Sequence, residues 1–283
     1  MLALGSTFVA CSDSNDDGGY DPNTAETPYK PLPGRKVASL KTTNTIDGRD
    51  YWWEHKFTYD ASGRIMEIKS EMQHYEARAG DYVLCKIYSD AFYYYRGNEL
   101  EVAYSLKRTY PNDLSIKNST DSGTDRGLFN SAGVLVRFHS ADFEYSGTSL
   151  RGAYFDGGVK YNVARDNSGN VTGYVRENEN NGEKDDCSGK YGYSRIRNKS
   201  NFDFSGYFGY WGVETGIYAN RLPYYASYQL AAFGMLGAIS SYLPLSVKDE
   251  NGNEYGTWEL DSRDCPVLYT APDGRRTEIT YID

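Results

Sequence analysis

The sequence has few of the residues that build metal centres and disulfide frameworks. Its 283 residues include only 4 cysteines and 3 histidines. They are Cys11, Cys85, Cys187 and Cys265, and His55, His74 and His139. The cysteines do not have the spacing of a zinc motif, and the histidines are dispersed along the chain. We therefore predict no metal site. Beyond Cys11, the three remaining cysteines allow at most one disulfide bond and leave one thiol free.

An excess of basic residues is also missing. Lysine and arginine total 30 against 39 aspartate and glutamate residues, which gives a net charge of −9. Binding to nucleic-acid phosphates needs clustered lysine and arginine, so we predict that nucleic acid is not a partner. The sequence also lacks a Ser-His-Asp order, an HExxH motif, a phosphate-binding loop and a dinucleotide fingerprint. We therefore expect a protein that is not an enzyme and needs no cofactor.

The segment around Cys11 has the features of a bacterial lipoprotein signal. The apolar run Leu2–Ala10 precedes the cysteine, and the acidic, small residues Ser12-Asp-Ser-Asn-Asp-Asp-Gly-Gly19 follow it. In such a signal the cysteine thiol carries a diacylglycerol, and its acyl chains hold the protein on a membrane. We predict that residues 1–11 are this signal and that Cys11 is the lipid attachment site. No basic residue precedes the apolar run, so we expect that the true start lies upstream or that the leader is trimmed.

A tether is predicted to follow the lipidated cysteine. Residues 12–34 are acidic at first and then rich in proline, with Pro22, Pro28, Pro31 and Pro33 before Gly34. A segment of this composition cannot bury enough apolar surface to fold, and its prolines keep it extended. The remaining residues, 35–283, are expected to form one β domain.

Tyrosine and alternating patterns dominate the rest of the sequence. There are 28 tyrosines, and aromatic residues make up 15% of the chain. In Tyr51–Tyr59 the odd positions are aromatic or histidine, whereas the even positions carry Trp52, Glu54, Lys56 and Thr58. Such period-two alternation predicts a strand with one aromatic face towards the core and one polar face towards water. The segment 100–107 repeats this pattern.

Glycine turns separate these strands at regular intervals. The turn Tyr59-Asp-Ala-Ser-Gly-Arg-Ile65 has variants at 129–135, 165–171, 247–253 and 270–276, with shorter glycine turns at 95–100 and 145–150. A series of consecutive hairpins is an antiparallel meander, and a long meander must curl, close or split to protect its edges. We therefore predict an all-β fold, a curved antiparallel meander or barrel-like sheet.

One segment departs from the strand pattern. Between Arg221 and Lys248 the chain carries no charged residue. Residues 224–238 follow Pro223 and are predicted to form one short helix. The length would suit a membrane span, but Gln229, several serines and two prolines favour a helix buried against the sheet.

These turns and their order resemble a known family. The motif Tyr-Asp-x-x-Gly-Arg-Ile resembles the hairpins of YD-type repeats. The order of features is similar to a family of uncharacterised lipoproteins from gut Bacteroidetes, a domain of unknown function with a porin-like fold. The matching segments are Phe57–Asp60, Tyr191–Ser194, Asn198–Asp203, Phe233–Gly237, Ser241–Pro244 and Asp273–Arg275. The resemblance implies a fold and an outer-membrane location, with Ser12–Asp17 similar to a surface-export signal. It implies no catalytic residues.

The surplus of aromatic residues suggests a binding function. Trp52 lies on the polar side of its predicted strand, and Tyr207, Tyr210 and Trp211 lie in a glycine-rich stretch. Exposed rings beside hydrogen-bonding groups suit stacking on sugars, although most rings in a tyrosine-rich sheet fill the core. We predict a lipid-anchored protein of the cell surface that binds a ligand, with a glycan as the candidate, without catalysis. The alternatives are an accessory partner of an outer-membrane complex and a lipid carrier with a cavity under the helix.

Overall fold

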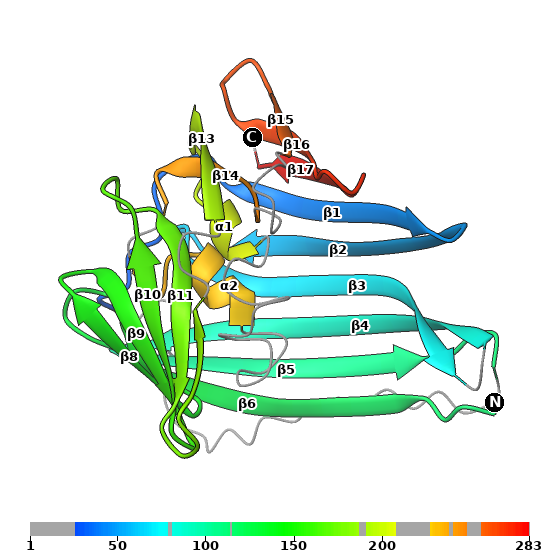
Figure 1. Cartoon of the computed structure of the whole chain (residues 1–283), viewed down its shortest axis with the longest axis horizontal. Helices are drawn as coiled ribbons and strands as arrows, with labels where there is room; N and C mark the ends of the chain where they lie inside the picture. The colour runs from blue at the N-terminus through cyan, green and yellow to red at the C-terminus, as the bar shows by residue number, and fades with distance from the viewer. Residues whose placement is uncertain are drawn as a thin grey trace, which may run out of the picture.

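The structure is a computed structural model, and it describes residues 26–78, 81–113, 115–186, 191–207, 227–237, 240–247 and 256–282. Cys11 and residues 12–25 of the predicted tether therefore lie outside the described residues. The described chain is dominated by one antiparallel sheet of 15 strands (Figure 1). This confirms the predicted all-β fold and its construction as a curved meander of consecutive hairpins.

The strands follow one another across the sheet, with one exception. From β12 back to β1 each strand pairs with its neighbour in the sequence, and β1 then pairs with the last strand, β17. In chain order they are β1 (Val37–Ile46), β2 (Arg49–Tyr59), β3 (Ile65–Arg78), β4 (Asp81–Arg96), β5 (Glu99–Thr109), β6 (Ser119–Phe129), β7 (Leu135–Phe138), β8 (Ala141–Ser146), β9 (Ser149–Phe155), β10 (Val159–Arg165), β11 (Val171–Asn178), β12 (Glu183–Asp186), β15 (Thr257–Leu260), β16 (Pro266–Thr270) and β17 (Arg276–Tyr281). The pairing of β1 with β17 joins the two ends of the folded chain inside the sheet.

Five hairpin turns share one geometry. After β2, the Asp60 N–H donates to Arg64 O at 2.9 Å, and the Gly63 N–H donates to Asp60 O at 3.0 Å. Gly63 adopts a φ of 84°, which glycine tolerates without a steric cost. The same pair of backbone bonds recurs in the turns 130–134, 166–170, 261–265 and 271–275. Four of these five turns were predicted from their glycines, and the predicted turn at 247–253 lies almost wholly outside the described residues.

The turn at 261–265 was not predicted. Its fourth position is Asp264, which stands where the other four turns have glycine and has a φ of 58°. Aspartate is one of the few other residues that adopt this left-handed conformation. Asp261 accepts the backbone N–H groups of Arg263 and Cys265 with one carboxylate oxygen, each at 2.9 Å, as Asn130 and Asp166 do at the first position of their turns.

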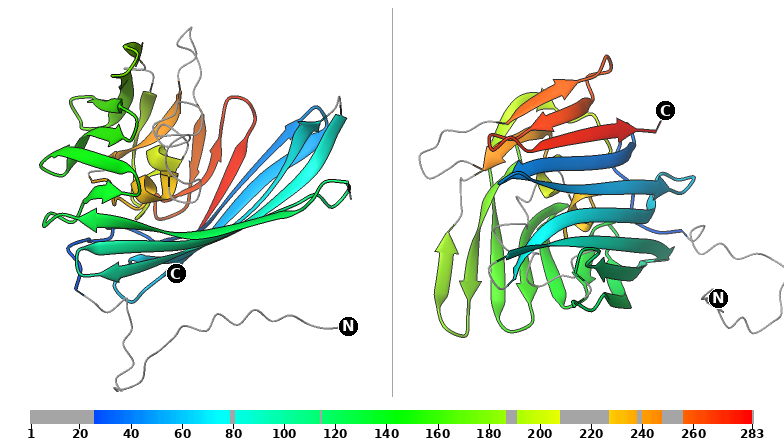
Figure 2. Two further views of the ribbon diagram at one scale, coloured as in Figure 1. Left: turned by 90° about the horizontal axis from the view of Figure 1, so that it is seen from below. Right: turned by 90° about the vertical axis from the view of Figure 1, so that its right-hand side faces the viewer.

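The sheet bends so that its two halves enclose the helices. The long strands β1 to β6 form one wall and β8 to β11 form another, and α1 (Phe204–Tyr207) and α2 (Ser227–Ala232) lie between them (Figure 2). We call the face towards these helices the inner face and the opposite face the outer face. The predicted alternation in β2 is confirmed, because His55 and Phe57 are buried on the inner face while Lys56 and Thr58 are exposed.

A pair of strands bridges the two edges of the large sheet. β13 (Tyr191–Arg197) and β14 (Tyr242–Val247) form a two-stranded sheet of their own. On one side the Tyr193 hydroxyl donates to Val171 O of β11 at 2.9 Å. On the other side the Trp258 indole N–H of β15 donates to Pro244 O at 2.6 Å. Side-chain hydrogen bonds thus connect β11 and β15 through this pair, and the described strands form a barrel-like sheet in which β13 and β14 pair only with each other.

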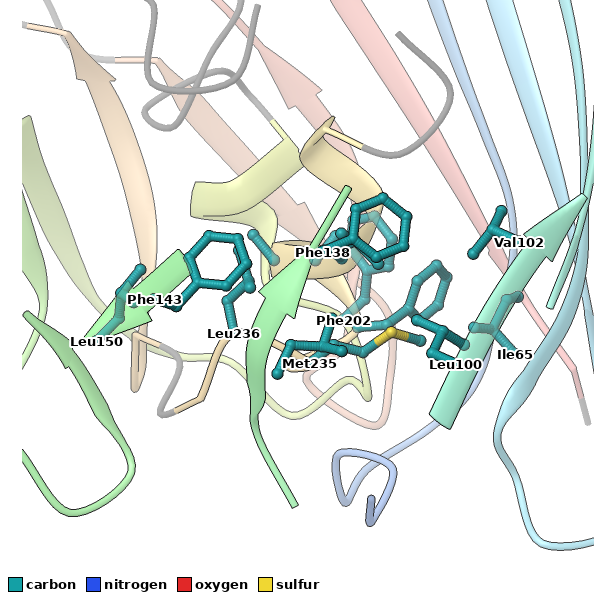
Figure 3. Packing of buried hydrophobic residues seen from close by; sticks show 14 of the residues in the cluster. Ile65, Leu100, Val102, Phe138, Phe143, Leu150, Phe202, Met235 and Leu236 are labelled. Carbon is teal, nitrogen blue, oxygen red and sulfur yellow. The ribbon is translucent and has the colours of Figure 1, made fainter. Parts of the chain in front are cut away.

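Aromatic side chains fill the inner face beneath the helices. The Phe233 ring, in the turn after α2, lies 5.3 Å from the rings of both Phe57 and Phe202. Its contacts with them are edge-to-face, an arrangement that the charge distribution of aromatic rings favours. The next two core residues of this turn, Met235 and Leu236, are also buried between the two walls (Figure 3).

The predicted buried helix is confirmed but is shorter than the sequence indicated. α2 ends at Ala232 rather than Ala238, because Gly234 has a φ of 73° and the Met235 N–H turns back to Leu230 O at 2.9 Å. The predicted residues 224–226 lie outside the described residues. Among the described helices, none has the length and apolar character needed to cross a membrane.

The folded domain begins before the predicted boundary at residue 35. Tyr29 is buried and stacks between the rings of Tyr95 and Phe129, at 5.6 and 5.3 Å. Its hydroxyl donates to Phe233 O at 2.8 Å. Burial raises the pKa of this phenol above its ordinary range, so the hydroxyl stays protonated and remains a donor. The proline-rich composition of residues 12–34 gave no indication that Tyr29 packs in the core.

Truncating Tyr29 should therefore destabilise the whole domain. We expect Tyr29→Ala to lower the free energy of unfolding by about 3–5 kcal/mol, the usual cost of removing a buried aromatic ring. Urea unfolding followed by circular dichroism measures the change. The neighbouring, exposed Lys30 provides the control, and Lys30→Ala should have almost no effect. Equal stability of the two variants would show that residues 26–34 do belong to the tether.

Candidate functional site

Aromatic side chains gather on the outer face of β2, β3 and β4. In β4 the odd-numbered residues from Cys85 to Tyr95 are buried on the inner face, so the even-numbered residues point outwards. The pairing of β3 with β4 and of β2 with β3 carries this face across three strands. The aromatic residues on it are Trp52, Tyr75, Tyr82, Tyr88, Phe92 and Tyr94, which we call the outer aromatic face. Tyr82, Tyr88 and Phe92 remain 46%, 38% and 39% exposed.

Trp52 is the aromatic residue that β2 contributes to this face. It pairs with Thr43 of β1 on one side and Gln73 of β3 on the other. The ammonium group of Lys41 lies 5.9 Å from the centre of the indole ring, within the range of a cation–π contact. Trp53 points to the opposite face and packs against the core. The two adjacent tryptophans therefore lie on opposite faces of the sheet, as the alternation predicted.

Two rings of this face, Tyr75 and Tyr82, lie near the end of β3 and the start of β4. These are the ends of the long strands that point away from the helices, and we call them the distal ends (Figure 1). The Arg49 guanidinium lies 4.2 Å from the centre of the Tyr82 ring and 6.0 Å from that of Tyr75. Tyr51 meets Tyr75 edge-on at 5.4 Å. Contacts of this kind hold exposed rings in fixed orientations, which lowers the entropy lost when a ligand stacks on them.

Charged groups of both signs separate the rings. Glu54 pairs with Lys56 at 3.2 Å, and Glu67 pairs with Lys69 at 3.1 Å, in each case two residues along the same strand. Exposed pairs of this kind add little stability. Their side chains instead supply hydrogen-bond donors and acceptors beside the rings, and the mixture of signs gives this face no strong net charge.

Of the four predicted ligand-binding residues, the structure describes the side chain of Trp52 alone. It lies on the outer face of β2 and is half-buried. Tyr207 is the last residue of α1, but its side chain is not among those described, and Tyr210 and Trp211 lie outside the described residues. Tyr75 and Tyr82 were not predicted. The signal for them was present, because β3 and β4 are separated only by Ala79 and Gly80 in the sequence, which fixes the register of the hairpin.

One buried carboxylate has the unusual environment of a catalytic acid but serves a structural purpose. Asp203 precedes α1, and burial raises the pKa of its side chain. Its Oδ1 accepts the Ser205 N–H at 3.0 Å and the Ser205 hydroxyl at 2.6 Å. Ser240 N–H also donates to Oδ2 at 3.4 Å. These bonds fix the start of α1 and the chain near Ser240, and they fully account for the burial of the group.

Three residues with metal-binding side chains meet on the inner face at the distal ends. They are His74 and Glu76 of β3 and Cys85 of β4, and their potential ligand atoms all lie within 4.8 Å of one another. The sequence analysis predicted no metal site, because the cysteines lack metal-ligand spacing and the histidines are dispersed along the chain. The strand register places them directly opposite each other. Cys85 and Cys265 are both free thiols, and Cys187 lies outside the described residues.

Comparisons with known proteins give structural likenesses only. No protein-family model matches the chain, and no curated protein matches it. A porin-like protein from Bacteroides uniformis is similar over 90% of this chain and 99% of its own, with 13% identity and a TM-score of 0.45. A porin-like protein from Bacteroides vulgatus is similar over 88% of this chain and 99% of its own, with 13% identity and a TM-score of 0.36. Likenesses at this level do not bear on the chemistry of the site.

The two adjacent tryptophans should respond differently to truncation. We expect Trp52→Ala to change the free energy of unfolding by about 1 kcal/mol or less, because the half-buried ring lies on the outer face and loses mainly its contact with Lys41. Trp53→Ala should cost about 2 kcal/mol or more, since it removes packing against the core. Denaturant unfolding of both variants under the same conditions measures the difference. A larger loss for Trp52→Ala would place that ring in the core.

Proposed function

We propose that this protein is lipid-anchored at the outer membrane, exposed at the cell surface, and binds carbohydrate through the outer aromatic face without catalysing a reaction. The observation that carries the proposal is the gathering of six aromatic rings on the polar face of three adjacent strands, with three of them more than a third exposed. An exposed apolar surface of this kind on a folded domain commonly marks a binding site.

The chemistry of the face suits a sugar. The C–H side of a sugar ring is apolar and flat, so it can cover an aromatic ring and displace water from it. Sugar hydroxyls at the rim of such a contact need donors and acceptors, which Glu54, Lys56 and Gln73 provide beside Trp52. The balance of acidic and basic side chains favours an uncharged sugar over a polyanion, because a polyanion would require a basic surface.

The surface location rests on the N-terminal segment. Two acyl chains on Cys11 would hold the protein firmly at a membrane. The chain from Cys11 to the buried Tyr29 could span at most about 65 Å when fully extended. This length would allow the domain to present its outer aromatic face to ligands beyond the bilayer.

Binding should appear directly in affinity electrophoresis through gels that contain soluble polysaccharides. We expect at least one uncharged polysaccharide to retard the wild-type protein. Trp52→Ala and Tyr82→Ala should each weaken the interaction about tenfold, which corresponds to the 1–1.5 kcal/mol typical of one stacked ring. Tyr154 of β9 provides a matched control, because Lys160 lies 4.9 Å from its ring but the pair is remote from β2 to β4. Tyr154→Ala should be retarded like the wild type.

A uniformly negative result across plant, microbial and host glycans would contradict carbohydrate binding. It would favour the alternative of an accessory protein in an outer-membrane complex. Cross-linking on intact cells, with a reactive group placed at Tyr88, would then identify the neighbour of this face.

Membrane attachment is tested by a separate substitution. We expect Cys11→Ala to move the protein from the membrane fraction to the soluble fraction, because the thiol that receives the lipid is gone. Immunoblotting of the two fractions after ultracentrifugation measures the distribution. Cys265→Ala removes a different free thiol and should leave the protein on the membrane. Retention of Cys11→Ala on the membrane would refute the predicted lipid anchor.

A further inference from the structure

The cluster of His74, Glu76 and Cys85 combines three different metal-binding groups on one face of a hairpin. His74 and Cys85 are register partners, and Glu76 lies two residues further along β3, so all three point to the inner face. His74 Nε2 and Glu76 Oε1 are 3.4 Å apart. Placing the cluster on a paired ladder fixes the positions of all three Cβ atoms.

These distances are close to those of a zinc centre. With bonds of about 2.0–2.1 Å to nitrogen, 2.0–2.2 Å to oxygen and 2.3 Å to sulfur, tetrahedral geometry separates the ligand atoms by roughly 3.3–3.6 Å. The His74–Glu76 separation already falls in this range. The widest separation in the cluster, at most 4.8 Å, needs a contraction of about an ångström, which side-chain rotation can supply. A thiolate and an imidazole select zinc over the harder calcium and magnesium ions.

The carboxylate is held by a second set of residues. Arg78 donates from Nη2 to Glu76 Oε2 at 2.8 Å, and the Tyr110 hydroxyl lies 3.2 Å from Oε2 and 3.3 Å from Oε1. Metal-binding carboxylates are commonly oriented by such partners. The strongest of these bonds engages Oε2, and Oε1 faces the His74 ring.

The imidazole of His74 has a nitrogen without a partner. Its Nδ1 is buried, and no described residue forms a hydrogen bond with it. Buried polar atoms without partners are uncommon in folded proteins and call for an explanation. A water molecule at Nδ1 would satisfy this atom while Nε2, the nitrogen that faces Glu76, binds the metal.

The charges around the cluster both favour and oppose a cation. A metal ion bound by Cys85 would displace the thiol proton, so the thiolate would become a second negative ligand beside Glu76. Arg78 and the Arg108 guanidinium, 4.0 Å from Glu76, oppose a cation. Their side chains are 47% and 40% exposed, so solvent screens much of their charge.

We propose that His74, Glu76 and Cys85 form a zinc-binding site at the distal ends of β3 and β4. Three protein ligands leave one tetrahedral position for water. His74 and Glu76 are partly exposed while Cys85 is buried, so the ion would enter from the side of the imidazole and the carboxylate. The site lies on the opposite face of the same strands from the outer aromatic face and does not depend on the proposed binding of carbohydrate.

The test is titration of the metal-free full-length chain with zinc chloride by isothermal calorimetry, together with titration with cobalt(II) followed by absorption. We expect saturable binding of one equivalent of zinc, and a thiolate-to-cobalt charge-transfer band. His74→Gln, Glu76→Gln and Cys85→Ser should each weaken zinc binding at least tenfold. Cys85→Ser should also abolish the charge-transfer band. Cys265→Ser is the matched control, because it removes the other described thiol, and it should retain both signals.

Two results would overturn the proposal. One is the absence of saturable zinc binding by the folded wild-type chain. The other is binding that survives His74→Gln and Cys85→Ser, which would assign the metal to another part of the chain. Circular dichroism checks the fold of each variant. If Cys85→Ser does not fold, His74→Gln decides the question, because His74 is partly exposed and its replacement spares the buried thiol.

Discussion

The structure depends on covering one face of a single wide sheet. A sheet of fifteen consecutive strands has a large apolar inner face, which the sheet cannot bury by curling alone. Side chains from other segments of the chain must therefore pack against this face. The segment that carries α2 provides such side chains, with Phe233 packed between Phe57 and Phe202. Tyr29 adds a ring from the N-terminal side, and its hydroxyl binds the backbone of Phe233. With the inner face occupied in this way, the outer face of β2 to β4 keeps Tyr82, Tyr88 and Phe92 exposed to solvent.

Local rules account for most of what the sequence could predict about the fold. Alternation in β2 and the glycine turns are set by neighbouring residues, so both could be read without the structure. The turn containing Asp264 was not predicted, because aspartate stands where the other four turns have the glycine used to recognise them. The length of α2 was overestimated because an uncharged stretch resembles a long helix, and only the backbone conformation at Gly234 shows where it ends. Tyr29 could not be predicted, since its pocket is built by strands far away in the sequence.

For the candidate sites too, residues placed by their own strand could be predicted from the sequence, whereas residues brought together by strand pairing needed the register. Trp52 was found because alternation within one strand is enough to place it on the polar side. Tyr82 and the pairing of His74 with Cys85 required the register of the hairpin formed by β3 and β4. That register could have been obtained from the two-residue connection, so this part of the site was accessible from the sequence. The closeness of Glu76 to Tyr110 also required the register of β4 with β5, which pairs Lys86 with Thr109.

The central claim is that adjacent residues of one strand serve separate purposes, with the core on one side and ligand binding on the other. Hydroxyl-radical labelling of the intact protein, read by mass spectrometry, tests it on β4 alone. Tyr82 and Tyr88 should be oxidised quickly, whereas Tyr93 and Tyr95, both almost fully buried, should be protected. A polysaccharide that retards the protein should slow oxidation of Tyr82 and Tyr88 without changing the other two. Fast oxidation of Tyr93 and Tyr95, or no protection of Tyr82 and Tyr88 by a bound polysaccharide, would contradict the account.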